Sequence, residues 1–188
     1  MFLDASRALA DHGRHFGETS ESVLATPGLY AVHGGADVWR LLGLGAPPDD
    51  RPLYVGKAEH TLAGRDVRTH FATGKTGNST LRRSLAGLLR DELGLKGMPR
   101  NPAKPGHFSN YGLEAAGDAA LTVWMRQHLR LATWSSPPSV DLGHLETELL
   151  QDLEPPLNLD KVRTSWRPLV RAGRAALATE AREWLPSC

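Results

Sequence analysis

The chain carries a small set of side chains whose types suit the hydrolysis of a phosphodiester bond. That reaction needs an activated water, positive charge beside the non-bridging oxygens and help for the departing oxygen. Tyr30 and Tyr54 stand in two short apolar runs, and Arg65, His70 and Glu146 follow along the chain. An arginine offers planar, permanently charged donors to a phosphate. A glutamate can hold one hard divalent cation that keeps most of its own waters, as magnesium does. These five residues are therefore candidates for such chemistry.

Two conditions must hold before this set can work. A tyrosine acts as a base only where its surroundings favour loss of the phenolic proton, because its ordinary pKa is about 10. Lys57, His70 or a metal close to Tyr30 would provide such surroundings. A site with a single carboxylate also binds its metal weakly. Whether these conditions are met depends on where the side chains lie, and so on the strands and helices that carry them.

Three short strands are expected. Residues 29–32 and 53–55 are runs of β-branched, aromatic and leucine residues bounded by glycine and proline. The proline-rich residues 43–52 between them predict a loop. Apolar and other residues alternate over 129–133, which predicts a third strand that the following prolines terminate.

Helices are expected around these strands. Apolar spacing and capping residues predict them over residues 61–71, 80–93, 118–128, 141–155 and 164–185. Asp118 is expected to cap the third of these helices. Residues 96–112, with three prolines and three glycines, predict an exposed irregular insertion.

Length and composition favour one domain. The chain has 188 residues, of which 40% are hydrophobic, enough for one ordinary core. We expect a core over residues 27–160 with helical extensions over 1–26 and 161–188. No long apolar run indicates a membrane span or a secretory signal, so a soluble, cytoplasmic protein is expected. The single cysteine, Cys188, excludes an internal disulfide and makes a zinc site implausible.

Two tripeptides resemble the signature of the GIY-YIG nuclease family. Residues 28–30 read Gly-Leu-Tyr and residues 54–56 read Tyr-Val-Gly, like the two halves of that signature. Arg65 and then His70 follow the second half, as in this family. Glu146 precedes a leucine pair and the Pro-Pro-Leu-Asn of residues 155–158, in the family's order. The resemblance covers residues 28–158 in short blocks. It implies an α/β (α+β) fold with a small three-stranded antiparallel sheet flanked by helices.

The resemblance also implies roles. Tyr30, Tyr54, Arg65, His70 and Glu146 would be catalytic, with Glu146 binding Mg²⁺ or Mn²⁺. Tyr30 would position or activate the water, and Tyr54 would orient the phosphate or the waters of the metal.

The pattern departs from the family in two places. Arg65 stands one place later than in shorter members, so Arg68 stays open as the catalytic arginine. The loop between the first two strands is also longer than in repair-type members and closer to restriction-type members. Asn158 would tie the loop after the glutamate helix back to the strands.

Charge is concentrated in one segment. Residues 57–90 hold seven lysines and arginines against two acidic residues, whereas the whole chain has a net charge of +1. A phosphate backbone would be drawn to this segment. The residues expected to bind phosphate or DNA are Lys57, Arg68, Lys75, Arg82, Arg83 and Asn158. The alternative is a solvated helix face that is balanced elsewhere in three dimensions.

Other interpretations accompany these residues. Tyr30 and Tyr54 could be strand aromatics packed under a helix, and Glu146 could be an exposed helix residue like its neighbour Glu148. Residues 74–76 read Gly-Lys-Thr, but Thr69 stands where a phosphate-binding loop needs its first glycine, so nucleotide binding is rejected.

Together these patterns favour a metal-dependent DNA endonuclease that acts on duplex DNA with one Mg²⁺ or Mn²⁺ ion. One alternative is a catalytically weak nucleic-acid-binding module on the same scaffold. Another is a nuclease that acts on RNA or on branched or damaged DNA, because nothing in the sequence reads the sugar. A homodimer is possible, since cutting both strands of a palindrome needs two sites related by a twofold axis.

Overall fold

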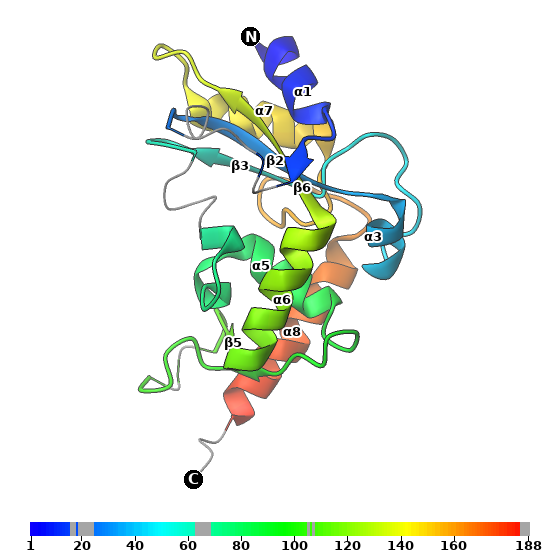
Figure 1. Cartoon of the computed structure of the whole chain (residues 1–188), viewed down its shortest axis with the longest axis vertical. Helices are drawn as coiled ribbons and strands as arrows, with labels where there is room; N and C mark the ends of the chain where they lie inside the picture. The colour runs from blue at the N-terminus through cyan, green and yellow to red at the C-terminus, as the bar shows by residue number, and fades with distance from the viewer. Residues whose placement is uncertain (16–17, 19–24, 63–68, 105, 107, 185–188) are drawn as a thin grey trace.

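A four-stranded antiparallel sheet forms the centre of the upper part of the molecule (Figure 1). The computed structural model describes residues 1–15, 18, 25–62, 69–104, 106 and 108–184. The strand order is β1-β6-β2-β3. The bounds are β1 (Arg14–His15), β2 (Gly28–Gly34), β3 (Tyr54–Ala58) and β6 (Leu129–Ser135). The three predicted strands are confirmed, and so is the α/β fold with an antiparallel sheet. The short edge strand β1 was not predicted.

Both faces of the sheet are covered, and the alternation along β2 shows it. Tyr30 and Val32 belong to one buried cluster, whereas Leu29 and Ala31 belong to the other. This is the alternation expected of a strand, whose successive side chains point to opposite faces. A central strand buried on both sides explains why the run is apolar at nearly every position rather than at every second one.

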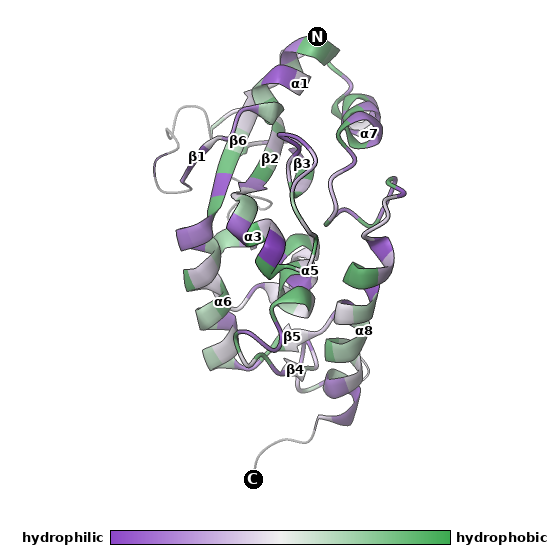
Figure 2. Ribbon diagram, turned by 90° about the vertical axis from the view of Figure 1, so that its right-hand side faces the viewer, coloured by the Kyte–Doolittle hydropathy of each residue, from purple (hydrophilic) through white to green (hydrophobic). Residues whose placement is uncertain are grey.

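The helices divide between the two faces of the sheet. Their bounds are α1 (Phe2–Ala10), α3 (Ala36–Leu41), α5 (Thr80–Leu88), α6 (Ala115–His128), α7 (Leu142–Leu153) and α8 (Arg167–Glu183), with a 3₁₀ turn η2 (Thr76–Asn78). Leu9 of α1 and Leu149 of α7 pack on one face, and Leu85 of α5 and Leu121 of α6 belong to the cluster on the other. In Figure 2, α5 lies between α6 and α8 in the lower part of the molecule.

Helix boundaries differ from the expectation at several places. Residues 78–80 offer caps for the helix expected over 80–93, and Ser79 is the one that caps α5, because its side chain accepts the N–H of Arg82. The helix ends at Leu88, earlier than expected. The predicted cap Asp118 is wrong: Glu114 holds the N-cap position, and Asp118 is buried in the first turn. Helix α3, in the connection between β2 and β3, was not predicted.

Two other segments, 96–112 and 61–71, were expected to be irregular and helical, respectively. The expected insertion at 96–112 contains two paired strands, β4 (Gly97–Met98) and β5 (Gly112–Leu113), so it is partly ordered. Of the helix expected over 61–71, residues 69–71 are helical and residues 63–68 lie outside the described part.

Helix α8 packs against α5 with the two backbones in contact. A Cβ added at Gly87 of α5 would lie 2.6 Å from the carbonyl carbon of Gly173, and one at Gly173 would lie 2.6 Å from the carbonyl oxygen of Gly87. Val170 and Leu177 of α8 are fully buried. The tail helix therefore contributes to the core of its own chain. The division into a core and two helical extensions stays a prediction.

No helix within the described residues is both long and apolar enough to cross a bilayer.

Candidate active site

Three aromatic rings meet on the lower face of the sheet. Tyr30 of β2 pairs with Gly56 of β3, two residues from Tyr54, so the two tyrosines are diagonal neighbours on one face. Their ring centroids lie 6.3 Å apart. The ring of His70 lies 5.7 Å from that of Tyr30 and 5.5 Å from that of Tyr54. The structure thus brings together three of the five predicted catalytic residues.

Gly56 makes room for this arrangement. A Cβ added at Gly56 would lie 2.4 Å from the hydroxyl oxygen of Tyr30 and 2.5 Å from its Cζ atom. Both atoms belong to a ring that is only 2% exposed, so the ring has no space to withdraw. A glycine is required here so that the Tyr30 ring can lie against the backbone of β3, because any side chain at position 56 would collide with Tyr30.

His70 connects the tyrosines to the N-terminus of α5. Its Nε2 lies 2.7 Å from the Tyr30 hydroxyl, and its Nδ1 lies 2.6 Å from the Ser79 hydroxyl. Burial, followed by the positive charge of Arg82, lowers the pKa of His70 to about 3. The imidazole is therefore neutral near neutral pH and carries one proton, which one of these two contacts must use.

Glu146 and Tyr54 line the same cavity. This cavity of about 250 Å³ opens beside the edge strand β3. It is lined by Tyr54, Thr80, Glu146, Asn158, Asp160 and Lys161, among others. Thr80 comes from α5 and Glu146 from α7, so helices on both faces of the sheet reach the cavity at its edge. The predicted convergence of the glutamate and the second tyrosine is present.

The Glu146 carboxylate already has a cationic neighbour. Lys161 Nζ lies 2.9 Å from Glu146 Oε2, and the Glu146 side chain is 13% exposed. Lys161 has a φ of 62°, in the left-handed region that non-glycine residues seldom adopt. The turn at residue 161 thus places an ammonium group on the predicted metal ligand. No motif or spacing in the sequence indicated a role for Lys161.

Asn158 ties the loop after α7 to β3, as expected. Its Oδ1 accepts the N–H of Val55 at 2.9 Å, and its Nδ2 donates to the Val55 carbonyl at 2.8 Å. Asn158 also lines the cavity beside β3, and its expected contact with phosphate stays a prediction. Asn158 positions the tyrosine strand against the glutamate helix.

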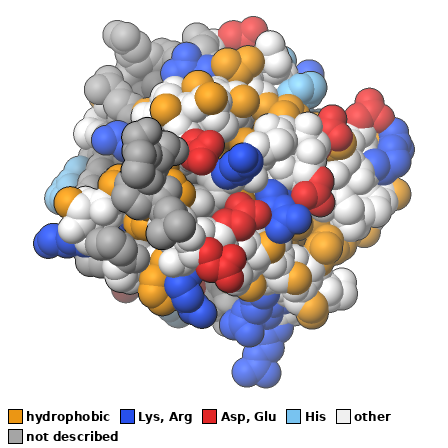
Figure 3. Space-filling view, turned by 90° about the horizontal axis from the view of Figure 1, so that it is seen from below, with side chains coloured by type: hydrophobic (Ala, Val, Ile, Leu, Met, Phe, Trp, Pro, Cys, Tyr) orange, Lys and Arg blue, Asp and Glu red, His pale blue; other side chains and the backbone are white. Residues whose placement is uncertain are grey.

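Three of the described basic residues in segment 57–90, Lys57, Arg82 and Arg90, have acidic partners. Lys57 pairs with Glu59 at 2.6 Å, and this contact is the main cause that raises the pKa of Lys57. Arg90 pairs with Asp91 at 3.0 Å and with Glu180 at 3.5 Å. Outside the grey atoms, Figure 3 shows basic and acidic side chains intermixed rather than one continuous basic surface.

Of the other basic residues in this segment, Lys75 is exposed, as expected of a phosphate contact. Arg65 and Arg68 lie outside the described residues.

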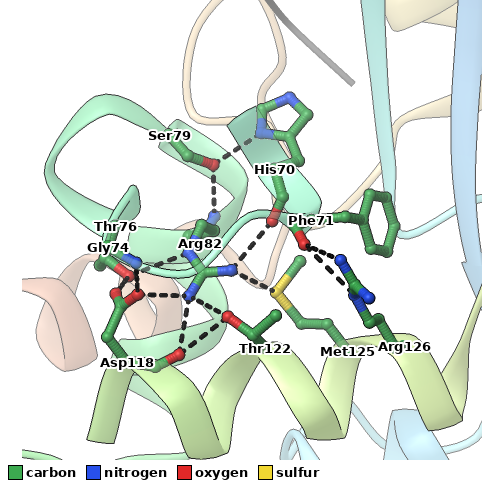
Figure 4. Close-up of polar contacts among 10 residues, drawn as sticks. All are labelled: His70, Phe71, Gly74, Thr76, Ser79, Arg82, Asp118, Thr122, Met125 and Arg126. Carbon is green, nitrogen blue, oxygen red and sulfur yellow. Dashed lines mark hydrogen bonds and ion pairs between the residues drawn. The ribbon is translucent and has the colours of Figure 1, made fainter. Parts of the chain in front are cut away.

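Arg82 was expected to bind phosphate at the surface, and this expectation is wrong. It is fully buried and donates to Thr76 Oγ1, to the carbonyl of His70 and to Thr122 Oγ1 (Figure 4). Its Nη2 also forms a 3.1 Å ion pair with Asp118, which in turn bonds Gly74 and Thr76. The physical reason is that this side of α5 faces α6, where the buried Asp118 supplies the opposite charge.

Arg83 is also more buried than expected. Only 8% of the residue is exposed, and its Nη1 donates to the Gly77 carbonyl at 2.8 Å. Burial is the main cause that lowers its pKa to about 10, and the neighbouring Arg174 is the next. Its predicted contact with phosphate stays a prediction.

A cavity larger than the one beside β3 lies elsewhere. Its volume is about 480 Å³, and His12, His33 and Asp50 are among its lining residues, none of which lines the cavity beside β3. Within the described part of the chain, no three histidine, cysteine or acidic side chains are grouped so as to hold a metal ion. Size alone therefore does not identify the site, and the aromatic cluster beside Glu146 remains the better candidate.

Comparison with known proteins agrees with this geometry. Searches of curated proteins and of solved structures give no match. A family model described as the GIY-YIG catalytic domain matches residues 49–173, more than half of the chain. The matched segment includes Tyr54, Glu146 and Asn158, and β2 places Tyr30 beside it. The chain belongs to the GIY-YIG family.

Proposed function

We propose that this chain is a metal-dependent endonuclease that hydrolyses phosphodiester bonds of duplex DNA beside the edge strand β3. Family membership supports nuclease chemistry in general. The observation that carries the proposal is the convergence of Tyr30, Tyr54 and His70 next to a cavity that Tyr54 shares with Glu146. A scissile phosphate would lie in that cavity.

The hydrogen bonds around His70 suggest how Tyr30 is activated. Ser79 is 1% exposed, so its hydroxyl proton needs an acceptor. Its oxygen already accepts the N–H of Arg82, and among the described residues the acceptor within reach is His70 Nδ1. The neutral imidazole then carries its own proton on Nε2 and donates it to the Tyr30 oxygen. This donation favours the phenolate form of Tyr30, which can take a proton from the attacking water.

Glu146 is the residue that would hold a divalent cation, Mg²⁺ or Mn²⁺. Its carboxylate lines a cavity that contains a second carboxylate, Asp160, and such oxygen donors fit a hard cation that keeps most of its waters. When bound, the cation supplies positive charge to the phosphate and makes a coordinated water more acidic. Lys161 must release Glu146 Oε2, or share the carboxylate, for this to occur.

Arg65 is proposed to contact the phosphate, with Arg68 as the alternative. Both proposals rest on the family resemblance. A homodimer also stays a proposal. The tail helix α8 is a poor candidate for its interface, because Val170, Leu177 and Ala181 are buried within their own chain.

One experiment tests the activity and its substrate. Purified protein is incubated with duplex, single-stranded and branched DNA and with RNA, with and without Mg²⁺. We expect metal-dependent cleavage of duplex DNA, and a loss of about 100-fold or more in Glu146→Gln. Glu148→Gln is the control, since Glu148 is exposed on the same helix. Equal losses in both variants would contradict the assignment of Glu146, and binding without cleavage by the wild type would favour the catalytically weak module.

A further inference from the structure

Two arginines at the crossing of α5 and α8 have no acidic partner among the described residues. The residue Arg83 is more than nine-tenths buried, and its buried Nε atom has no hydrogen-bond partner in the described part of the chain. Arg174 of α8 is partly buried and has no hydrogen bond or ion pair with any described residue. Buried cations are normally paired with an anion, so two neighbouring guanidinium groups without an acidic partner in the described part of the chain require an explanation.

The geometry of the helix crossing brings these two charges together. Arg83 lies one turn before Gly87, and Arg174 follows Gly173 directly, so both arginines flank the point where the backbones touch. After burial, Arg174 is the largest influence that lowers the pKa of Arg83, as expected for a neighbouring like charge. Burial likewise lowers the pKa of Arg174. The fold therefore holds two positive charges close together at a cost in stability.

The arginine pair borders the proposed active site. Thr80 lines the cavity beside β3 and precedes Arg83 by three residues on α5, so the two lie on the same side of that helix. Tyr54, which lines the same cavity, is among the groups that act on the pKa of both Arg83 and Arg174. An anion bound by the two arginines would thus lie next to the position of the scissile phosphate.

We propose that Arg83 and Arg174 form a subsite for a backbone phosphate of the nucleic acid, adjacent to the cavity of Tyr54 and Glu146. Guanidinium groups bind phosphate oxygens with paired hydrogen bonds, and the phosphate would supply the negative counter-charge for Arg83 and Arg174. The subsite rests on the proposed function for its substrate. It adds a contact from the C-terminal helix.

Arg174→Gln tests the subsite, with Arg171→Gln as the matched control. Arg171 lies one turn earlier on α8 and is exposed, so its replacement changes net charge equally. Without phosphate, we expect Arg174→Gln to melt at a higher temperature than the wild type, because it removes the like charge beside Arg83. Inorganic phosphate should stabilise the wild type more than sodium chloride of equal ionic strength does. Arg174→Gln should lose that difference.

Binding to uncleavable duplex DNA without metal completes the test. The slope of log K against log salt should decrease in magnitude by about 0.9 in Arg174→Gln, the effect of one phosphate contact, and should not change in Arg171→Gln. Arg174→Lys keeps the charge but not the planar donors, and we expect weaker phosphate stabilisation with most of the slope retained. Parallel titrations with RNA show whether the subsite distinguishes the two backbones.

The possible outcomes separate the subsite from the nuclease activity. If Arg174→Gln melts at a lower temperature and keeps the full slope, Arg174 is structural and the proposal is wrong. Phosphate stabilisation with an unchanged slope would mean a small-anion site and would also overturn the assignment to nucleic acid. A slope that depends on Arg174 in a protein that never cleaves would leave the subsite intact and contradict the nuclease.

Discussion

Arg82 and Arg83 are adjacent on α5, yet they meet opposite surroundings. Arg82 faces α6, where Asp118 and several oxygen acceptors satisfy its guanidinium. Arg83 belongs to the side that meets α8, where Arg174 is the charged group that lowers its pKa most and its Nε has no acceptor among the described residues. Successive residues of a helix point about 100° apart, so one step along the chain selects a different partner helix. A closed network contributes to stability, whereas an open one is suited to binding a ligand.

Breaking the closed network should have the largest effect on stability. Asp118→Ala leaves Arg82 charged, fully buried and without its counter-charge. We expect a loss of about 3–5 kcal/mol in the free energy of unfolding, measured by urea denaturation. Asp91→Ala is the control: it breaks an arginine–aspartate pair whose aspartate is 90% exposed, and it should cost less than about 1 kcal/mol. Similar losses in both variants would remove the distinction between the two kinds of pair.

His70 contacts both the closed network around Arg82 and the proposed active site, and its burial makes stability depend on pH. Its carbonyl accepts from Arg82, and its ring contacts Tyr30. The pKa of His70 in the folded chain, about 3, lies below the ordinary value of 6.5. Between these two pH values His70 is protonated in the unfolded chain and neutral in the folded chain. Stability should therefore fall as pH falls from about 6.5 towards 3, by up to about 1.4 kcal/mol per pH unit.

Comparing the wild type with His70→Asn isolates this contribution. The variant should be less stable at pH 7 but should lose less stability on acidification. Urea denaturation at several pH values measures the two slopes. Parallel slopes would show that His70 is not the group responsible.

Ser79 joins the closed network to the proposed active site. Ser79→Ala removes the cap of α5, which should cost about 1 kcal/mol, and it removes the donor to His70 Nδ1. We expect ¹⁵N spectra of the imidazole to show the Nε2–H tautomer in the wild type and a mixture in Ser79→Ala, with rescue by Ser79→Thr. Asp141→Ala, which uncaps α7, is the control that should leave the tautomer unchanged. An Nδ1–H tautomer in the wild type would contradict the proposed direction of the hydrogen bond to Tyr30.

The smallest effect is expected at Glu146. Lys161→Met removes the ammonium group that shares this carboxylate, so the apparent affinity for Mn²⁺ should rise, by no more than about 5-fold, because such partly exposed pairs are weak. Stabilisation by Mn²⁺ in thermal denaturation measures this without reference to cleavage. Lys96→Met, at an exposed position between α5 and β4 that does not line the cavity, controls for net charge. Unchanged or weaker Mn²⁺ binding would mean that Lys161 does not compete with the metal.

Local sequence patterns predicted the parts of the site that depend on local structure. The three main strands, the Ser79 cap and the tie between Asn158 and β3 follow from short motifs, and the structure contains them. The two tripeptides also predicted that Tyr30 and Tyr54, which stand 24 positions apart, would lie close together. The reason is that neighbouring strands place alternate residues on one face of the sheet.

Pairings between distant helices could not be predicted in this way. The partner of Arg82 is 36 residues away on α6, and Asp118 looked like a helix cap because its type suits both positions. Lys161 reaches Glu146 through a left-handed residue that no local pattern indicates. Counting charges over residues 57–90 therefore overstated the basic surface.

The contact between Gly56 and Tyr30 gives the two tripeptides a shared constraint. Gly56 belongs to the tripeptide 54–56, and the Tyr30 side chain, which occupies the space where a side chain at position 56 would lie, belongs to the tripeptide 28–30. A change at one of these two positions therefore affects the other. A larger residue at position 56 would collide with the Tyr30 ring and force it away from His70. In related sequences, an alanine at this place should therefore accompany a smaller side chain at the first tyrosine position, and both changes together should mark copies that have lost the phenol.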